Sequence, residues 1–175
     1  VGAWTANDIA HQAALEHNSA GDMGTTILAA ILLPSGHFAL VWVGDSRGYK
    51  VTPSGLVHLH YVHNLASEHL ERGTFDGGED EAKKARGANI LTRSLGRPRG
   101  KLRLDGGPEA MRGHLAQGER LLLCSDGVWG EMTDEIIRTS VSSADRPATA
   151  CSALLAAAYT RGAEDNISAI VAEIR

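Results

Sequence analysis

Cysteine is scarce in this sequence: Cys124 and Cys151 are the only two among 175 residues. Each lies among apolar neighbours, which predicts reduced thiols in a folded core rather than a disulfide framework. We therefore expect a cytoplasmic protein. A long apolar run is also lacking, because the longest candidate, residues 25–33, falls short of the roughly 18–20 residues of a membrane helix. Residues 1–7 have neither the basic start nor the apolar stretch of a signal peptide.

Positive charge is in short supply as well, since 17 lysines and arginines face 21 acids, for a formal net charge of −4. A protein that binds nucleic acid by neutralising its phosphates needs the opposite balance, so this class is excluded. Hydrophobic residues make up 43% of the chain and charged residues 22%, which argues against wholesale disorder. The length fits one domain with a sizeable core.

The apolar pattern of the first third predicts a helix followed by an antiparallel meander. The expected elements are a helix at residues 7–18, a strand at 25–33, a turn at 34–36, a strand at 37–43 with apolar residues on both faces, and short strands at 49–51 and 56–61. Residues 64–88 are rich in charge and glycine, which indicates a surface excursion with short helices.

The remaining segments complete a layered α+β domain, residues 1–175, without repeats or a dividing linker. Residues 89–95 return to apolar alternation, Leu102 and Leu104 indicate another strand, helices are expected from Thr133 and at 147–159, and a strand closes the chain at 167–174.

The most informative stretch is residues 121–129, in which three leucines and Cys124 form a short buried strand that ends at Asp126. We expect Gly127 to bend the backbone there through a positive φ. An aspartate-glycine pair at a strand end is most simply a turn. Asp165, however, stands at the entrance to the closing strand, and if the two strands are neighbours, both carboxylates converge. Converging carboxylates must share a proton or hold a cation.

Other candidate sites carry less weight. Four histidines (His58, His60, His63 and His69) could suggest zinc, but no further ligand has a fixed spacing to them, so a solvated strand face is the better interpretation. Ser125 lacks the surroundings of a hydrolase nucleophile. A basic cluster at residues 97–101 is most simply a solvated loop. Trp42 and Trp129 are expected in the core.

Five short motifs nevertheless occur in order along the chain. They are Gly24-Thr25-Thr26, Gly44-Asp45-Ser46-Arg47, the sequence Leu-Thr-Arg-Ser-Leu-Gly at 91–96, Ser-Asp-Gly-Val-Trp at 125–129, and Asp165-Asn166. Together they resemble the bacterial members of the metal-dependent serine/threonine protein phosphatases of the PP2C (PPM) type. The resemblance extends from Gly21 almost to the end of the chain.

This resemblance implies an α/β/β/α sandwich of two antiparallel sheets flanked by helices, with two Mg²⁺ or Mn²⁺ ions at one end. Asp126 and Asp165 would be metal ligands, and Asp45, Arg47, Gly127 and Asn166 would support the site. Residues 64–88 would form the flap beside the substrate groove. The implied activity is hydrolysis of phosphomonoesters on proteins by a metal-activated water, opposing a serine/threonine kinase.

The pattern also departs from the family, because its first motifs, which supply a phosphate-binding arginine and a metal-bridging aspartate, are absent. Residues 1–20 offer only Asp8 and Glu16, and neither precedes a glycine. We expect a domain that is incomplete at its N-terminus and can dimerise through an exposed sheet edge. The alternatives are a degenerate, non-catalytic binding or regulatory module of the same fold, and an unrelated layered domain.

Overall fold

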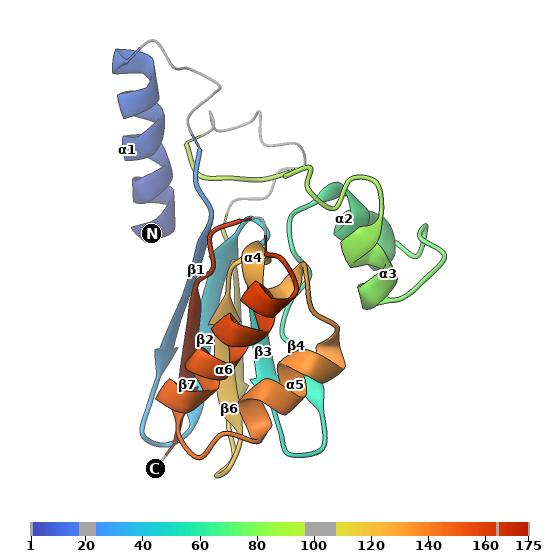
Figure 1. Cartoon of the computed structure of the whole chain (residues 1–175). Helices are drawn as coiled ribbons and strands as arrows, with labels where there is room; N and C mark the ends of the chain where they lie inside the picture. Colours follow the sequence, from blue (N-terminus) through green and yellow to red (C-terminus); the bar gives the residue numbers. More distant parts are fainter. Residues whose placement is uncertain (1, 18–23, 97–107, 164, 175) are drawn as a thin grey trace.

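The computed structural model describes residues 2–17, 24–96, 108–163 and 165–174, and its strands form two antiparallel sheets (Figure 1). The three-stranded sheet has the order β1-β2-β5 and the four-stranded sheet the order β4-β3-β6-β7. The strands are β1 (Ile27–Leu32), β2 (His37–Val43), β3 (Arg47–Val51), β4 (Leu56–His58), β5 (Glu109–His114), β6 (Arg120–Cys124) and β7 (Ala169–Glu173). The predicted α+β sandwich of two antiparallel sheets flanked by helices is confirmed.

One topological prediction is wrong. The expected meander would place β2 beside β3, but β2 pairs with β1 and β5, whereas β3 pairs with β4 and β6. The turn between them carries the chain from one sheet to the other. Gly44 makes this turn possible: its φ is +109°, and a Cβ there would lie 2.3 Å from the Thr26 side chain.

The core consists of two apolar layers, and β6 contributes to both. Leu121 and Leu123 face the three-stranded sheet, together with Phe38, Leu40, Trp42 and Leu115. Leu122 and Cys124 face the other way, into a layer formed with Tyr49, Val51, Val128, Trp129, Ile137, Val141 and Leu154. This alternation follows from the two-residue period of a strand. Trp42 and Trp129 are buried, as predicted, and both cysteines are free.

Strand β2 is buried more completely on one face than on the other. Phe38, Leu40 and Trp42 are buried between the sheets. Ala39 and Val41 on the opposite face are half-buried, and Ile31, which pairs with Ala39, is 69% exposed. The prediction of two buried faces is therefore only partly right, because apolar residues alone do not reveal whether a further layer covers a sheet.

The helices are α1 (Gly2–Glu16), α2 (Leu65–Glu71), α3 (Glu79–Lys84), α4 (Asp126–Trp129), α5 (Asp134–Ser142) and α6 (Pro147–Thr160). Helices α5 and α6 cover the outer face of the four-stranded sheet (Figure 1), and α1 is joined to Gly96, whose N–H donates to Asn7 Oδ1 at 3.0 Å. Helix α1 begins five residues before the predicted start. No helix among the described residues is long and apolar enough to cross a membrane.

The excursion at residues 64–88 forms α2 and α3, as its composition predicts. Its base is closed by an isolated bridge between Asn64 and Leu91 and by hydrogen bonds from Leu65 N to Ile90 O and from Thr92 N to His63 O. Residues 89–95 make such single bridges rather than the expected strand. The predicted strand at Leu102 and Leu104 and the basic cluster at 97–101 lie outside the described residues.

Candidate metal centre

Asp126 lies just after the buried strand β6 and is the first residue of α4, a helix of a single turn. Its Oδ1 accepts a hydrogen bond of 2.9 Å from Gly127 N. The preceding residue, Ser125, binds the loop before β7, because its Oγ donates to Asn166 O at 3.1 Å and accepts from Ser168 N at 3.0 Å. The end of β6 and the entrance to β7 are thereby held together.

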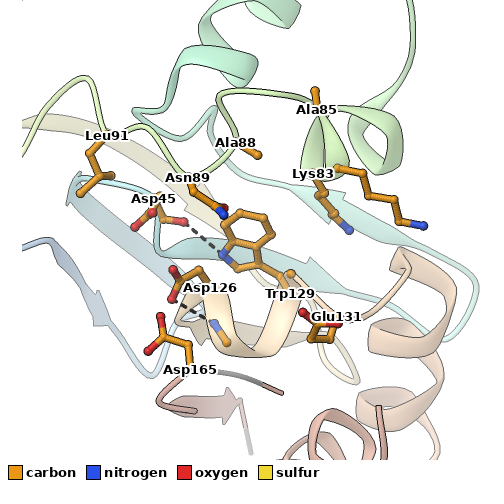
Figure 2. A pocket seen from close by; sticks show the side chains of 13 residues that line it. Asp45, Lys83, Ala85, Ala88, Asn89, Leu91, Asp126, Trp129, Glu131 and Asp165 are labelled. Atoms are coloured by element: carbon orange, nitrogen blue, oxygen red, sulfur yellow. Dashed lines mark hydrogen bonds between the residues drawn. The ribbon is translucent and has the colours of Figure 1, made fainter. Parts of the chain in front are cut away.

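Asp165 lies in this second loop, where its Oδ1 accepts from Asn166 N at 2.6 Å. Strands β6 and β7 are antiparallel neighbours, with Cys124 opposite Ala169, as the convergence of the two carboxylates requires. Asp126 and Asp165 line the same pocket and point toward one another (Figure 2). Asn166 takes part through its backbone N–H and carbonyl.

Gly127 is required for a reason other than the predicted one. Its φ is not positive, because it lies within α4. A Cβ on Gly127 would instead lie 2.5 Å from the carbonyl oxygen of Asn166. Close approach of the β7 loop, rather than a special backbone conformation, explains the glycine.

Asp45 is the third aspartate of the pocket, and sequence reasoning assigned it only a supporting place. It follows β2, which belongs to the other sheet, so the sandwich itself brings it to Asp126 and Asp165. Burial, and then the nearby charge of Asp126, raises the pKa of Asp45 to about 6, and Asp165 adds to this shift. The Gly-Asp pair was the available signal, since Gly44 marks a sharp turn at a strand end.

Arg47 lies beneath the pocket rather than in its lining. The residue is 2% exposed, and its guanidinium carbon lies 4.1 Å from the centre of the Trp129 ring. Trp129 Nε1 in turn donates to Asp45 O at 3.1 Å. The arginine thus supports, through a cation–π contact, the ring that holds the Asp45 backbone.

The pocket has a volume of about 750 Å³ and two unlike walls. Asp45, Asp126 and Asp165 form one wall, and residues 83–91, from the end of α3 onward, contribute to the other (Figure 2). Oxygen ligands of this kind suit a hard cation such as Mg²⁺ or Mn²⁺. The raised pKa of Asp45 supports this fit, because a cation would offset the repulsion among the three carboxylates.

The carboxylates are nevertheless spread over the pocket. Within the described ranges, no three histidine, cysteine or acidic side chains are close enough to hold one metal ion together. A cation here would therefore take much of its coordination from water, as Mg²⁺ commonly does.

The histidines do not form a solvated strand face. His58 Nε2 donates to Asp134 Oδ2 at 2.6 Å, and the ring of His60 stacks on Trp42 with a centroid distance of 4.5 Å. His63 is 3% exposed, and its Nδ1 accepts from Gly44 N at 3.1 Å. Three of the four histidines thus pack into the structure, a result that alternation along a strand could not reveal.

The fold and the site together define an α+β sandwich domain with an acidic pocket at one end of its sheets. The family model "Protein phosphatase 2C" matches residues 3–167, and the chain belongs to this family. The serine/threonine phosphatase stp of Listeria welshimeri is 31% identical over 151 residues, which cover 86% of this chain and 57% of that protein. PstP of Mycobacterium tuberculosis is 28% identical over 95% of the chain and 30% of its own length.

Solved structures show the same fold. A bacterial serine phosphatase superposes with a TM-score of 0.82 at 24% identity, covering 97% of this chain and 65% of that one. The catalytic domain of PstP in complex with two manganese ions gives a TM-score of 0.77 at 24% identity, over 95% of this chain and 66% of that one. The chain thus spans less than two thirds of these relatives.

Proposed function

We propose that this domain is a metal-dependent serine/threonine protein phosphatase that hydrolyses phosphomonoesters through a metal-activated water. The observation that carries the proposal is the meeting of Asp45, Asp126 and Asp165, from both sheets of a protein phosphatase 2C fold, in one pocket. The names of the Listeria and Mycobacterium relatives, and the two manganese ions of the PstP structure, support it.

In this proposal, each part of the pocket has a task. Asp126 and Asp165, oriented by the backbone N–H groups of Gly127 and Asn166, bind Mg²⁺ or Mn²⁺ ions, and Asp45 adds a third negative charge. A bound ion supplies a water of lowered pKa and offsets negative charge on the phosphoryl oxygens. Residues 83–91 form the opposite wall, against which the phosphorylated segment of a protein would lie.

The proposed substrates are phosphoserine and phosphothreonine proteins in the cytoplasm, made by an opposing serine/threonine kinase. The free thiols fit a reducing compartment, and the net charge of −4 fits a partner other than nucleic acid.

A second candidate is a degenerate module of the same fold that binds phosphoproteins without hydrolysis. The wide spacing of the acidic side chains within the described residues favours it, because a loosely held ion activates water poorly.

Hydrolysis of a small aryl phosphate in the presence of Mn²⁺ separates the two candidates. The phosphatase proposal predicts turnover that Asp126→Ala lowers by about 100-fold or more, whereas Asp145→Asn, an exposed acid outside the pocket, leaves the rate unchanged. The measurement is made on this chain and on a longer chain that adds preceding residues. Absence of metal-dependent turnover in both chains contradicts the proposal and favours the binding module.

A further inference from the structure

Helix α3 forms part of the pocket wall, yet few apolar contacts hold it. It contains six residues, too few for a stable isolated helix. It packs against α2, and the buried apolar residues across 64–88 are three alanines, Ala66, Ala82 and Ala88. Some other interaction must fix α3 beside the carboxylates.

A buried lysine supplies this interaction. The side chain of Lys83 is 2% exposed, and its Nζ lies 2.5 Å from Asp134 Oδ1 and 3.4 Å from Met132 O. Asp134 is the first residue of α5, which packs on the sandwich. The ion pair therefore joins the excursion to the body of the domain. A lysine this deeply buried requires a charged partner, because burial of an unpaired ammonium group away from water costs too much free energy.

Asp134 is itself held from the other side. Its Oδ2 accepts from His58 Nε2 at 2.6 Å, and His58 Nδ1 accepts from Arg47 Nη1 at 3.5 Å. Burial opposes ionisation of Asp134, but the hydrogen bonds from His58 and Lys83 outweigh it and lower its pKa to about 2. The carboxylate is thus a fixed negative charge at neutral pH, oriented by two partners.

The chain of contacts continues to the pocket. Arg47 supports the ring of Trp129, which binds the backbone of Asp45. The residues at and after Lys83 face the same pocket from the other wall (Figure 2). A change at the ion pair would therefore move the wall opposite Asp45, Asp126 and Asp165 while leaving these three aspartates in place.

We propose that Lys83 is a positioning residue: its ion pair with Asp134 anchors α3 and so sets the wall against which a phosphorylated protein segment lies. Lys83 acts through the position of the wall rather than through contact with the phosphate. The effect on substrate rests on the proposed function, whereas the anchoring of α3 does not.

Hydrogen exchange of the 175-residue chain tests the anchor directly. In Lys83→Met and in Asp134→Asn, amides of residues 79–84 should exchange at least about tenfold faster, while those of β6 and α6 keep their rates. Lys83→Arg, which retains the charge, should restore most of the protection. Lys84→Met is the matched control, because Lys84 is the exposed neighbour on the same helix. In this variant, the amides of residues 79–84 should exchange at the same rates as in the parent chain.

Two results would overturn the proposal: unchanged exchange at 79–84 in both variants, or equal acceleration across the whole chain, which indicates a general loss of stability. If Asp134→Asn fails to fold, Lys83→Met decides alone, because Lys83 lies outside both core layers. In a chain that shows turnover, Lys83→Met should raise KM for a phosphoprotein more than for a small aryl phosphate. Altered exchange, with no turnover in either the 175-residue chain or the longer chain, would contradict the proposed function and leave the anchor intact.

Discussion

Three aspartates that line one pocket repel one another, and at the scale of single residues Asp45 shows this effect. Its pKa is raised by burial and by Asp126, so ionisation is less favourable in the folded chain than in the unfolded one. The linked stability is present below the unfolded pKa of 3.8 and is lost as the pH rises through about 6. The pocket therefore carries a cost at neutral pH that a cation would remove.

Replacement of Asp45 by asparagine should relieve that cost. In metal-free buffer at pH 7.5, we expect Asp45→Asn to raise the free energy of unfolding by about 1 kcal/mol, after allowance for solvent screening. At pH 4, where Asp45 is mostly protonated in the fold, the difference should shrink. Urea denaturation at the two pH values measures both effects. A variant less stable than the parent at pH 7.5 would show that the carboxylate is not strained by its neighbours.

Two histidines give the opposite pH dependence. Burial lowers the pKa of His60 and of His63 to about 4, and each ring nitrogen that would take the proton already accepts a backbone N–H, from Gly48 and from Gly44. Between about pH 6.5 and pH 4, His60 and His63 are protonated in the unfolded chain but remain neutral in the folded chain. The free energy of unfolding therefore falls as the pH falls through this window.

This acid sensitivity can be assigned to a residue. His60→Gln should reduce the slope of unfolding free energy against pH by up to about 1.4 kcal/mol per pH unit within the window. His69→Gln, at an exposed position, is the matched control and should leave the slope unchanged. The account of His60 fails if both variants behave alike.

At the scale of elements, strands were predictable where apolar patterning is local, as in β2 and β6, and so were the two helices of the 64–88 excursion. It was not predictable that β2 and β3 belong to different sheets. The chain passes from one sheet to the other at the turn containing Gly44, and the apolar residues on either side, such as Val43 and Tyr49, do not indicate the geometry of that turn. Asp45 was therefore expected only beside the site, and its place in the pocket lining comes from the structure, whereas the approach of Asp126 to Asp165 followed from pairing of β6 with β7.

The contact between the β6 and β7 loops is a testable feature of these elements. Gly127→Ala would place a methyl group 2.5 Å from Asn166 O, so the loop carrying Asp165 must move. We expect a loss of about 1–3 kcal/mol in unfolding free energy and weaker Mn²⁺ binding. Gly55→Ala, where the nearest atom is 3.5 Å away, is the control and should change neither. An unaffected Gly127→Ala would contradict the close packing of the two loops.

At the scale of the whole molecule, β1 and β7 are terminal strands of their sheets among the described residues. Each carries an exposed isoleucine, Ile31 at 69% and Ile170 at 63%. Exposed apolar edge strands are templates for pairing with another chain. The motifs allowed the family and sheet architecture to be predicted, but exposure of these edges depends on the order of strands, which only the structure gives.

We therefore expect the 175-residue chain to self-associate in a concentration-dependent manner. Ile31→Lys or Ile170→Lys should shift the equilibrium toward monomer, because a lysine on an edge strand disfavours pairing. Tyr159→Lys is the control: it removes a large side chain that is 68% exposed on α6, away from any sheet edge. Sedimentation velocity measures all four proteins. A parent chain that stays monomeric at high concentration would contradict association through these edges.

The central claim is that Asp126 and Asp165 bind a cation in the pocket that Asp45 also lines, and a Mn²⁺ titration of the 175-residue chain tests it most directly. We predict weak binding, in the high micromolar to millimolar range, because water supplies much of the coordination. Asp126→Asn and Asp165→Asn should each weaken binding by about tenfold or more, and Asp145→Asn should not. Binding that is absent, or that survives unchanged in the two pocket variants, would contradict the claim.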